Sequence, residues 1–397
     1  MKISTDPKKI SELLTRGVEN VYPTREFLEK RLKSGERLTL YTGYDPTATS
    51  LHVGNAITMM KLRQFQELGH QVIMLIGDFT GLIGDPTDKT AARKQQTREE
   101  VLKNCAGWKK QASTILDFGG DNPVELKYNS EWLAKLKFAD VLELCSHFTV
   151  QQMLERDMFQ ERMKQEKPIY VHEFMYPLMQ GYDSVAMDVD GEIGGNDQTF
   201  NMLAGRDLLK EMKNKEKFVL TTKLLADTSG KKMGKSEGNV IALTDSPEDM
   251  FGKVMSWTDG MIIPGFVLCT TKPMSEIEKM EQEIKDGVNP RGEKVALAYE
   301  IVKTFLGEKA AFIAQENFVK VFSEKQKPEK MPEIKPAAYD IVSVLVEAKI
   351  CKSKSEARQV IDQGGVKIND KKVAAIDVKV KSGDIVQKGS RWFVKVK

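Results

Sequence analysis

One histidine stands where the chain could bind phosphate. The stretch DPTATSLHVGN, residues 45–55, contains His52, one of only four histidines in the sequence. A strand is predicted before it, and a helix is predicted to begin near Gly54. The free N–H groups at a helix N-terminus favour phosphate, and an imidazole there can donate a hydrogen bond to it. The pattern alone is equally compatible with a histidine that only stabilises its loop.

The basic segment GKKMGKSEGN, residues 230–239, is the second candidate. It combines glycines with Lys231, Lys232 and Lys235. Glycines give a mobile loop, and lysines supply point charges that can follow a triphosphate. Such a loop can reach the charge that develops during phosphoryl transfer. A solvated basic turn is the alternative, and the segment by itself does not decide between them.

The elements around His52 predict a parallel α/β sheet. RLTLYTG reads as a strand that delivers Tyr41, Gly43 and Asp45 to its carboxyl end, and NAITMMKLRQFQELG as a helix with one apolar stripe. QVIMLIG is a continuous apolar run, as expected of a strand buried on both faces. Strand, helix and strand with short links form a βαβ unit. We therefore expect a doubly wound sheet with ligands at the carboxyl ends of its strands.

Composition limits the class of protein. A chain of 397 residues is expected to form two or three domains. The four cysteines lie far apart without a CxxC pair, which disfavours a disulfide framework or zinc site and suits a reducing compartment. The N-terminus lacks the apolar core of a signal peptide, and no apolar run is long enough to span a membrane. A cytoplasmic protein is expected.

The pattern along the chain divides it into four parts. Residues 1–239 hold the sheet with a mostly helical, Met-rich insertion at about 125–215, and residues 240–322 read as helical. Residues 323–336 combine prolines with charges, as linkers do. Residues 337–397 form a basic tail on a slightly acidic body, which suggests a polyanion as its partner. A solvated basic surface is equally compatible with that charge.

Together, the two motifs carry a family resemblance. A His-x-Gly-Asn turn, followed some 180 residues later by Lys-Met-Gly-Lys-Ser, resembles the His-Ile-Gly-His and Lys-Met-Ser-Lys-Ser signatures of class I aminoacyl-tRNA synthetases. LYTGYDPTATSLHVGN, GLIGDPTDKTAAR, YPLMQGYD and GGNDQTFN look like the bacterial-type tyrosyl-tRNA synthetases, in the expected order. SKSEARQVIDQGGVKINDKKV resembles the S4 RNA-binding fold that these enzymes carry at this end. The resemblance covers nearly the whole chain.

The resemblance implies a Rossmann-like catalytic domain, a helical domain and a small α+β S4-like domain. For tyrosine, it implies that Tyr41 and Asp183 bind the phenol, while Tyr176 and Gln180 lie beside the ammonium and Asp85 supplies negative charge. Tyr176, Gln180 and Asp183 are four and three residues apart, which places them on one helix face. In isolation, a polar helix surface would explain that spacing as well.

For ATP, the resemblance implies contacts spread over three segments. Thr47, His52 and Asn55 meet the phosphates beside Gly43 and Asp45, and Gly54 lets adenine or ribose pack on the backbone. Gly195, Asp197 and Gln198 lie near the ribose and the activated carboxyl. The residues that close over the leaving pyrophosphate are Lys89, Arg93, Lys232, Lys235 and Ser236. Mg²⁺ is expected on the pyrophosphate side, and no residue is assigned as a metal ligand.

Two positions depart from the family pattern. Asn55 replaces the second histidine of the first signature, and glycine replaces serine in Lys-Met-Gly-Lys-Ser. Both lysines remain, and an amide can still donate a hydrogen bond. The details at Asn55 are therefore the part of the family picture that this sequence leaves most open.

The expected partners follow from the resemblance. They are L-tyrosine, ATP, tRNA(Tyr) and a second copy of the chain, with Lys352, Lys354 and Arg358 as the RNA-binding candidates of the tail. Two rivals stay open at this point. One is a tryptophanyl-tRNA synthetase-like enzyme with the same fold, and the other is a non-catalytic RNA-binding protein on the same scaffold. The Gln180–Asp183 pairing and the basic tail argue against the tryptophanyl-type enzyme. His52 and the motif lysines argue against the non-catalytic RNA-binding protein.

Overall fold

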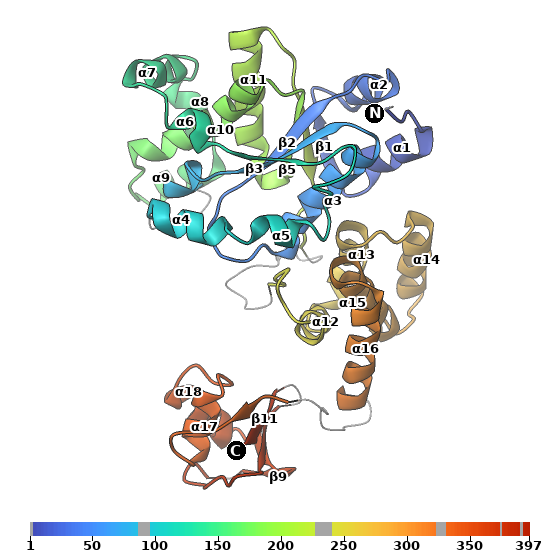
Figure 1. Ribbon diagram of the computed structural model, residues 1–397, viewed down its shortest axis with the longest axis vertical. Coiled ribbons are helices and arrows are strands. Elements are labelled where there is room, and N and C mark those ends of the chain that lie inside the picture. Colours follow the sequence, from blue (N-terminus) through green and yellow to red (C-terminus); the bar gives the residue numbers. More distant parts are fainter. Residues whose placement is uncertain (1–2, 86–95, 227–239, 323–330, 374, 390–391) are drawn as a thin grey trace. The chain divides into compact units, whose positions relative to one another are not determined.

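The computed structural model describes residues 3–85, 96–226, 240–322, 331–373, 375–389 and 392–397 (Figure 1). The chain forms two compact units, Met1–Ala311 and Phe312–Lys397. Within the described ranges, no helix is both long and apolar enough to cross a lipid bilayer.

A six-stranded sheet organises the first unit. Its strand order is β1-β6-β5-β2-β3-β4, and all neighbours run parallel except β1, which pairs antiparallel with β6. The strands are β1 (Val18–Tyr22), β2 (Thr39–Tyr44), β3 (Gln71–Ile76), β4 (Glu125–Tyr128), β5 (Gly191–Gly195) and β6 (Phe218–Thr222). The prediction of a doubly wound, largely parallel sheet is confirmed.

The predicted βαβ unit is β2, α3 (Val53–Glu67) and β3. The apolar stripe of the helix is buried against the sheet, with Met59, Leu62 and Phe65 fully buried. All residues of β3 except its first are also buried, as the continuous apolar run predicted. The paired positions run from Thr39 opposite Gln71 to Tyr44 opposite Ile76, so both strands end at the same edge of the sheet.

The direction of chain crossover changes between β2 and β5. From β2 the chain crosses through α3 to β3, whereas from β5 it crosses through α11 (Thr199–Lys213) to β6, on the other side of the β2–β5 pair. Because such crossovers are right-handed, α3 and α11 cover opposite faces of the sheet, as Figure 1 shows. The change of direction leaves a crevice at the carboxyl ends of β2 and β5, where ligands bind in such folds.

Helices make up most of the rest of the first unit. The first two are α1 (Pro7–Thr15) and α2 (Arg25–Lys33). Between β3 and β5 the described helices are α4 (Arg98–Cys105), α5 (Trp108–Ala112), α6 (Ser130–Leu133), α7 (Phe138–Ser146), α8 (Val150–Leu154), α9 (Asp157–Lys164) and α10 (Val171–Met187). The prediction that the middle of the chain is mostly helical is confirmed, and α10 packs against α11.

A helical region follows, as predicted. Its helices are α12 (Pro247–Met255), α13 (Ile262–Cys269), α14 (Met274–Lys285), α15 (Arg291–Leu306) and α16 (Glu308–Phe322). Arg16 joins this region to the N-terminal segment. Its guanidinium donates to the carbonyl oxygens of Phe266, Val267 and Thr270, at the C-terminal end of α13, and so supplies partners that the helix itself lacks.

The second unit is a small α+β fold with its own apolar core. It contains α17 (Ile341–Glu347), α18 (Lys354–Asp362) and a five-stranded sheet in the order β7-β11-β10-β8-β9. The strands are β7 (Glu333–Ile334), β8 (Val366–Ile368), β9 (Lys371–Lys372), β10 (Ile385–Lys388) and β11 (Trp392–Val396). Ser353 caps α18, because its side-chain oxygen accepts the Glu356 N–H at the start of the helix.

One element of this sheet differs from the sequence interpretation. Glu333 and Ile334 belong to the proline-rich segment that was expected to be a linker, yet they form β7 and pair in parallel with Lys395 and Val396. The pairing joins residues some sixty positions apart, so the local composition of the segment could not indicate it.

Candidate active site

A cavity of about 410 Å³ lies at the carboxyl ends of β2 and β5. It is bordered by the end of β2, the N-terminus of α3, one side of α10 and the segment after β5. Every predicted tyrosine- or ATP-binding residue that the structure describes lines it: Tyr41, Gly43, Asp45, Thr47, His52, Gly54, Asn55, Asp85, Tyr176, Gln180, Asp183, Gly195, Asp197 and Gln198. The fold therefore brings distant motifs to one place.

The remaining predicted residues lie elsewhere. Lys89, Arg93, Lys232, Lys235 and Ser236 fall outside the described residues. The RNA-binding candidates of the tail are exposed on the second unit, where Lys352 precedes α18 and the other two, Lys354 and Arg358, belong to it.

The N-terminus of α3 is built around His52, its cap residue. The Asn55 Oδ1 accepts the His52 N–H at 3.1 Å, so the oxygen of this amide stabilises the turn and its Nδ2 is the donor that can serve a ligand. A Cβ on residue 54 would lie 2.9 Å from the His52 imidazole, so the ring can occupy this position only because residue 54 is glycine. The His-x-Gly-Asn pattern thus has a structural reason at three of its positions.

The chain returns to this turn just after residues 227–239. Val53 N–H donates to the Ile241 carbonyl at 3.0 Å, and Leu243 N–H donates to the Leu51 carbonyl at 2.8 Å. Ile241 and Leu243 are therefore anchored beside His52.

Asp183, on α10, lies at the closed end of the cavity. The Trp132 indole donates to its Oδ1 at 2.7 Å, and Asn129 Nδ2 lies 3.3 Å from its Oδ2. Tyr41, on β2, is fully buried, and its hydroxyl lies 2.9 Å from Ser184 Oγ. Both residues can hydrogen-bond a hydroxyl group, and that is the chemistry needed to recognise a phenol.

Burial dominates the electrostatics of this end. It raises the pKa of Asp183 well above its ordinary value, against the opposing effect of the Trp132 and Asn129 hydrogen bonds. It also raises the pKa of Tyr41, with further contributions from the Glu192 and Asp183 carboxylates. Tyr41 is consequently a neutral hydroxyl over the physiological range. An additional hydrogen-bond donor next to Asp183 would stabilise the ionised form of its carboxylate.

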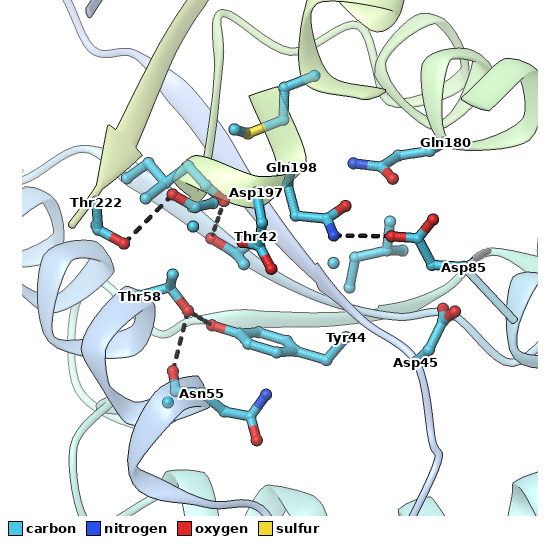
Figure 2. A pocket seen from close by; sticks show the side chains of 18 of the residues that line it. Thr42, Tyr44, Asp45, Asn55, Thr58, Asp85, Gln180, Asp197, Gln198 and Thr222 are labelled. Atoms are coloured by element: carbon cyan, nitrogen blue, oxygen red, sulfur yellow. Dashed lines mark hydrogen bonds between the residues drawn. The ribbon is translucent and has the colours of Figure 1, made fainter. Parts of the chain in front are cut away.

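Asp85 provides the carboxylate of the other end. Gln198 Nε2 donates to its Oδ2 at 2.8 Å, as Figure 2 shows, and Arg156 donates to its Oδ1 at 3.0 Å. Arg156 is itself buried and lies over the Phe159 and Phe200 rings. A carboxylate has about four lone-pair sites, so Asp85 can accept another donor, such as an ammonium.

Asp45 is held in place by the hydroxyl groups of two side chains. The Tyr176 hydroxyl donates to its Oδ2 at 2.8 Å, and the Thr80 hydroxyl donates to its Oδ1 at 2.7 Å. A Cβ on Gly77 would lie 2.1 Å from Asp45 Oδ1, so the arrangement also depends on that glycine. Burial, followed by the Asp45 and Asp85 charges, raises the pKa of Tyr176, which therefore acts as a neutral donor.

Several residues of the site were missed in the sequence. Asn129 and Trp132 follow β4, and Thr80 follows β3, so the rule that ligands gather at carboxyl ends of strands could have indicated them. Glu192 receives a 3.0 Å hydrogen bond from Gln180, and it was visible only as a charge inside the glycine-rich strand GEIGG. Lys217, its ion-pair partner, gave no recognisable signal.

Comparison with known proteins identifies the class to which this fold and site belong. Residues 33–323 match the family described as tRNA synthetases class I (W and Y), and residues 324–392 match the tyrosine–tRNA ligase SYY-like C-terminal domain. The chain belongs to the class I tRNA synthetases.

The similar proteins narrow this to the tyrosine branch. The chain is 42% identical to the tyrosine–tRNA ligase of Haemophilus influenzae, over 99% of this chain and 98% of that protein. It is 44% identical to the tyrosine–tRNA ligase of Carboxydothermus hydrogenoformans, over 98% of each. A C-terminally truncated mitochondrial tyrosyl-tRNA synthetase of Aspergillus nidulans has a similar structure, with a TM-score of 0.66, 25% identity, and coverage of 79% of this chain and 94% of that one. The chain is thus a member of the tyrosine–tRNA ligases.

Proposed function

We propose that this chain activates L-tyrosine with ATP to tyrosyl-adenylate and pyrophosphate, then transfers tyrosine to the 3′-terminal ribose of tRNA(Tyr). The Tyr41–Asp183 pair at the closed end of the cavity is the observation that carries the choice of amino acid. A phenol bound there would accept from one residue and donate to the other, and phenylalanine would leave both without that partner. Rejection of phenylalanine by unpaired polar groups in tyrosyl-tRNA synthetase is an established example of this effect.

The same cavity has room for the rest of the amino acid. Asp85, Gln180 and Tyr176 lie on the side where the ammonium would be held, and Gln198 is next to Asp85. The carboxylate would then point toward the N-terminus of α3. Because this nucleophile is already an anion, it attacks the α-phosphorus without a general base, and catalysis rests on positioning and on stabilising charge.

For ATP, His52, Asn55 and Thr47 would meet the phosphates at the N-terminus of α3. Gly43, Asp45 and Gly54, with Gly195 and Asp197, would border the nucleoside. Lys89, Arg93, Lys232, Lys235 and Ser236 would close over the pyrophosphate, a role that rests on their motifs. The anchoring of Ile241 and Leu243 beside His52 supports a clamp made of the two signatures.

Magnesium would enter as part of the ATP substrate. Among the described residues, no group of three His, Cys, Asp or Glu side chains could hold a metal ion on its own. Phosphate oxygens would therefore supply most of its ligands, which is how Mg²⁺ commonly binds in nucleotide sites.

We further propose a homodimer that acts in the cytoplasm. Large apolar side chains are exposed on α7 to α10, and clusters of this kind mark protein interfaces. They are Phe138, Leu142, Val150, Met163, Tyr170 and Val171. Sedimentation equilibrium tests the assembly, since a monomer at micromolar concentration would refute it.

The tail would bind tRNA(Tyr) through Lys352, Lys354 and Arg358. The proposed organisation is a catalytic domain at 1–239, an anticodon-recognition domain at 240–322, a linker at 323–336 and an S4-like domain at 337–397. Phosphate contacts would make tRNA affinity depend strongly on salt.

The decisive experiment is pyrophosphate exchange measured with each of the twenty amino acids. Exchange that depends on tyrosine is the expected result. Exchange with tryptophan alone would refute the choice of substrate, and no exchange with any amino acid would refute the enzymatic function.

A further inference from the structure

A buried ion pair lies directly behind the cavity. Lys217 Nζ is 2.5 Å from Glu192 Oε2, and the side chains are 0% and 2% exposed. The pair joins β5 to the start of β6, and its Lys217 ammonium also lies 5.9 Å from the centre of the Tyr41 ring. Replacement of such a pair by apolar residues is often neutral or stabilising, so its stability contribution alone does not explain why two charges are placed here.

The pair reaches the closed end of the cavity through Ser184. Lys217 Nζ donates to Ser184 Oγ at 2.8 Å, and that oxygen lies 2.9 Å from the Tyr41 hydroxyl. An ammonium can only donate, so the serine oxygen is an acceptor toward Lys217. A hydroxyl polarised in this way is a stronger donor, which favours donation from Ser184 to Tyr41. The Tyr41 proton then points away from Ser184. Its acceptor within the protein is the Gln180 carbonyl oxygen at 3.5 Å, a long hydrogen bond that a ligand in the cavity can replace.

The same pair reaches the other end through Gln180. Gln180 Nε2 donates to Glu192 Oε1 at 3.0 Å. An ionised carboxylate only accepts, so it must face the NH2 group of this amide, and the amide orientation is fixed chemically. The Gln180 oxygen is therefore the atom that remains for a cationic group. Figure 2 shows this side chain extending into the cavity.

A glycine leaves the space that this arrangement needs. A Cβ on Gly205, in α11, would lie 2.8 Å from Lys217 Nζ and 2.9 Å from Ser184 Oγ. The contact between α10 and α11 is thus shaped around the Lys217–Ser184 hydrogen bond.

We propose that Lys217 and Glu192, acting through Ser184 and Gln180, are positioning residues that set the hydrogen-bond direction at both ends of the tyrosine site. Through Ser184 the pair turns the Tyr41 hydroxyl into a donor toward the substrate phenol. Through Gln180 it presents an amide oxygen to the substrate ammonium. The inference rests on the proposed function, because it takes tyrosine as the ligand.

The test uses the full-length chain and pyrophosphate exchange with tyrosine and with phenylalanine. Ser184→Ala removes the link to the phenol end only, and we expect it to lower the tyrosine-to-phenylalanine ratio of kcat/KM roughly tenfold, about the effect of one hydrogen bond. Lys217→Met should lower this ratio and also raise the KM for tyrosine. The KM for ATP should stay within twofold in both.

Glu173→Gln is the matched control for Glu192→Gln. Glu173 forms a comparably buried pair with Arg162 at 2.6 Å, but neither residue lines the cavity. Glu192→Gln should raise the KM for tyrosine, whereas Glu173→Gln should leave it unchanged.

The outcomes separate the two hypotheses. If the unmodified chain shows no tyrosine-dependent exchange, the proposed function fails. If it does, and the folded Ser184→Ala and Glu192→Gln variants keep the parent's amino-acid ratio and tyrosine KM within twofold, the positioning role is wrong. Ser184→Ala only shortens a small buried side chain, so it remains informative even if Lys217→Met does not fold.

Discussion

The Trp132 indole donates a 2.7 Å hydrogen bond to Asp183 Oδ1 at the closed end of the cavity. The two residues come from α6 and α10, and the bond helps to hold a buried carboxylate whose pKa is already raised by burial. The proposed phenol site therefore depends on a residue that does not itself line the cavity.

Trp132→Phe should weaken recognition of the phenol. The change removes one donor to Asp183, so the pKa of Asp183 should rise further and its carboxylate should become a poorer partner. We expect kcat/KM for tyrosine to fall roughly tenfold while that for phenylalanine stays nearly unchanged, as for the loss of one hydrogen bond to a charged group. Pyrophosphate exchange with both amino acids measures this.

Trp108→Phe is the control for this change. Trp108 lies in the same unit and is buried, whereas Trp132 is half-buried, but the Trp108 indole N–H has no acceptor among the described residues. The Trp108→Phe variant should keep the parent's tyrosine-to-phenylalanine ratio of kcat/KM. If Trp132→Phe left the tyrosine-to-phenylalanine ratio of kcat/KM unchanged, Trp132 would have no role in substrate recognition.

Asn55→Asp should preserve the stability of the fold but lower the activity. The aspartate keeps an oxygen for the His52 N–H and suits the first turn of a helix, so the melting temperature should be kept or raised. It loses the amide donor and adds a negative charge beside the proposed phosphate site. We expect tyrosine-dependent exchange to fall at least tenfold, with a higher KM for ATP. Parallel thermal unfolding and exchange assays test this, and full activity would exclude an Asn55–phosphate contact.

The sequence predicted the β2–α3–β3 unit because its periodicity is strong and its contacts are close in the chain. It also predicted cavity residues where a motif marked them. The Lys217–Glu192 pair could not be found, because the two residues meet only once β5 and β6 lie side by side. Trp132 and Asn129 were missed because the chain from about residue 125 was interpreted as mostly helical, so their position just after the strand β4 was not recognised.

A chain that ends after residue 330 should retain the first reaction. The second unit has its own core and sheet, and none of its described residues lines the cavity. Tyrosine-dependent exchange should stay within about twofold of the full chain, whereas charging of tRNA(Tyr) at physiological salt should fall at least tenfold through lost phosphate contacts. Loss of both reactions would show that the second unit is needed for the fold or chemistry of the first.

His70 should make the protein sensitive to acid. It is fully buried, its Nδ1 accepts the Leu38 N–H at 3.2 Å, and burial lowers its pKa to about 4 from an ordinary value of 6.5. Above pH 6.5 the residue is neutral in both the folded and the unfolded chain. As the pH falls from 6.5 to 4, His70 becomes protonated in the unfolded chain but stays neutral in the folded chain. The free energy of unfolding therefore decreases over this window.

Replacing His70 tests that linkage, because about 1.4 kcal/mol per pKa unit amounts to roughly 3 kcal/mol over the whole window. His70→Asn keeps an oxygen that can accept the Leu38 N–H but cannot titrate. The free energy of urea unfolding should therefore fall less steeply between pH 6.5 and 4 in this variant than in the parent. Equal slopes for His70→Asn and the parent would show that His70 does not cause the acid sensitivity.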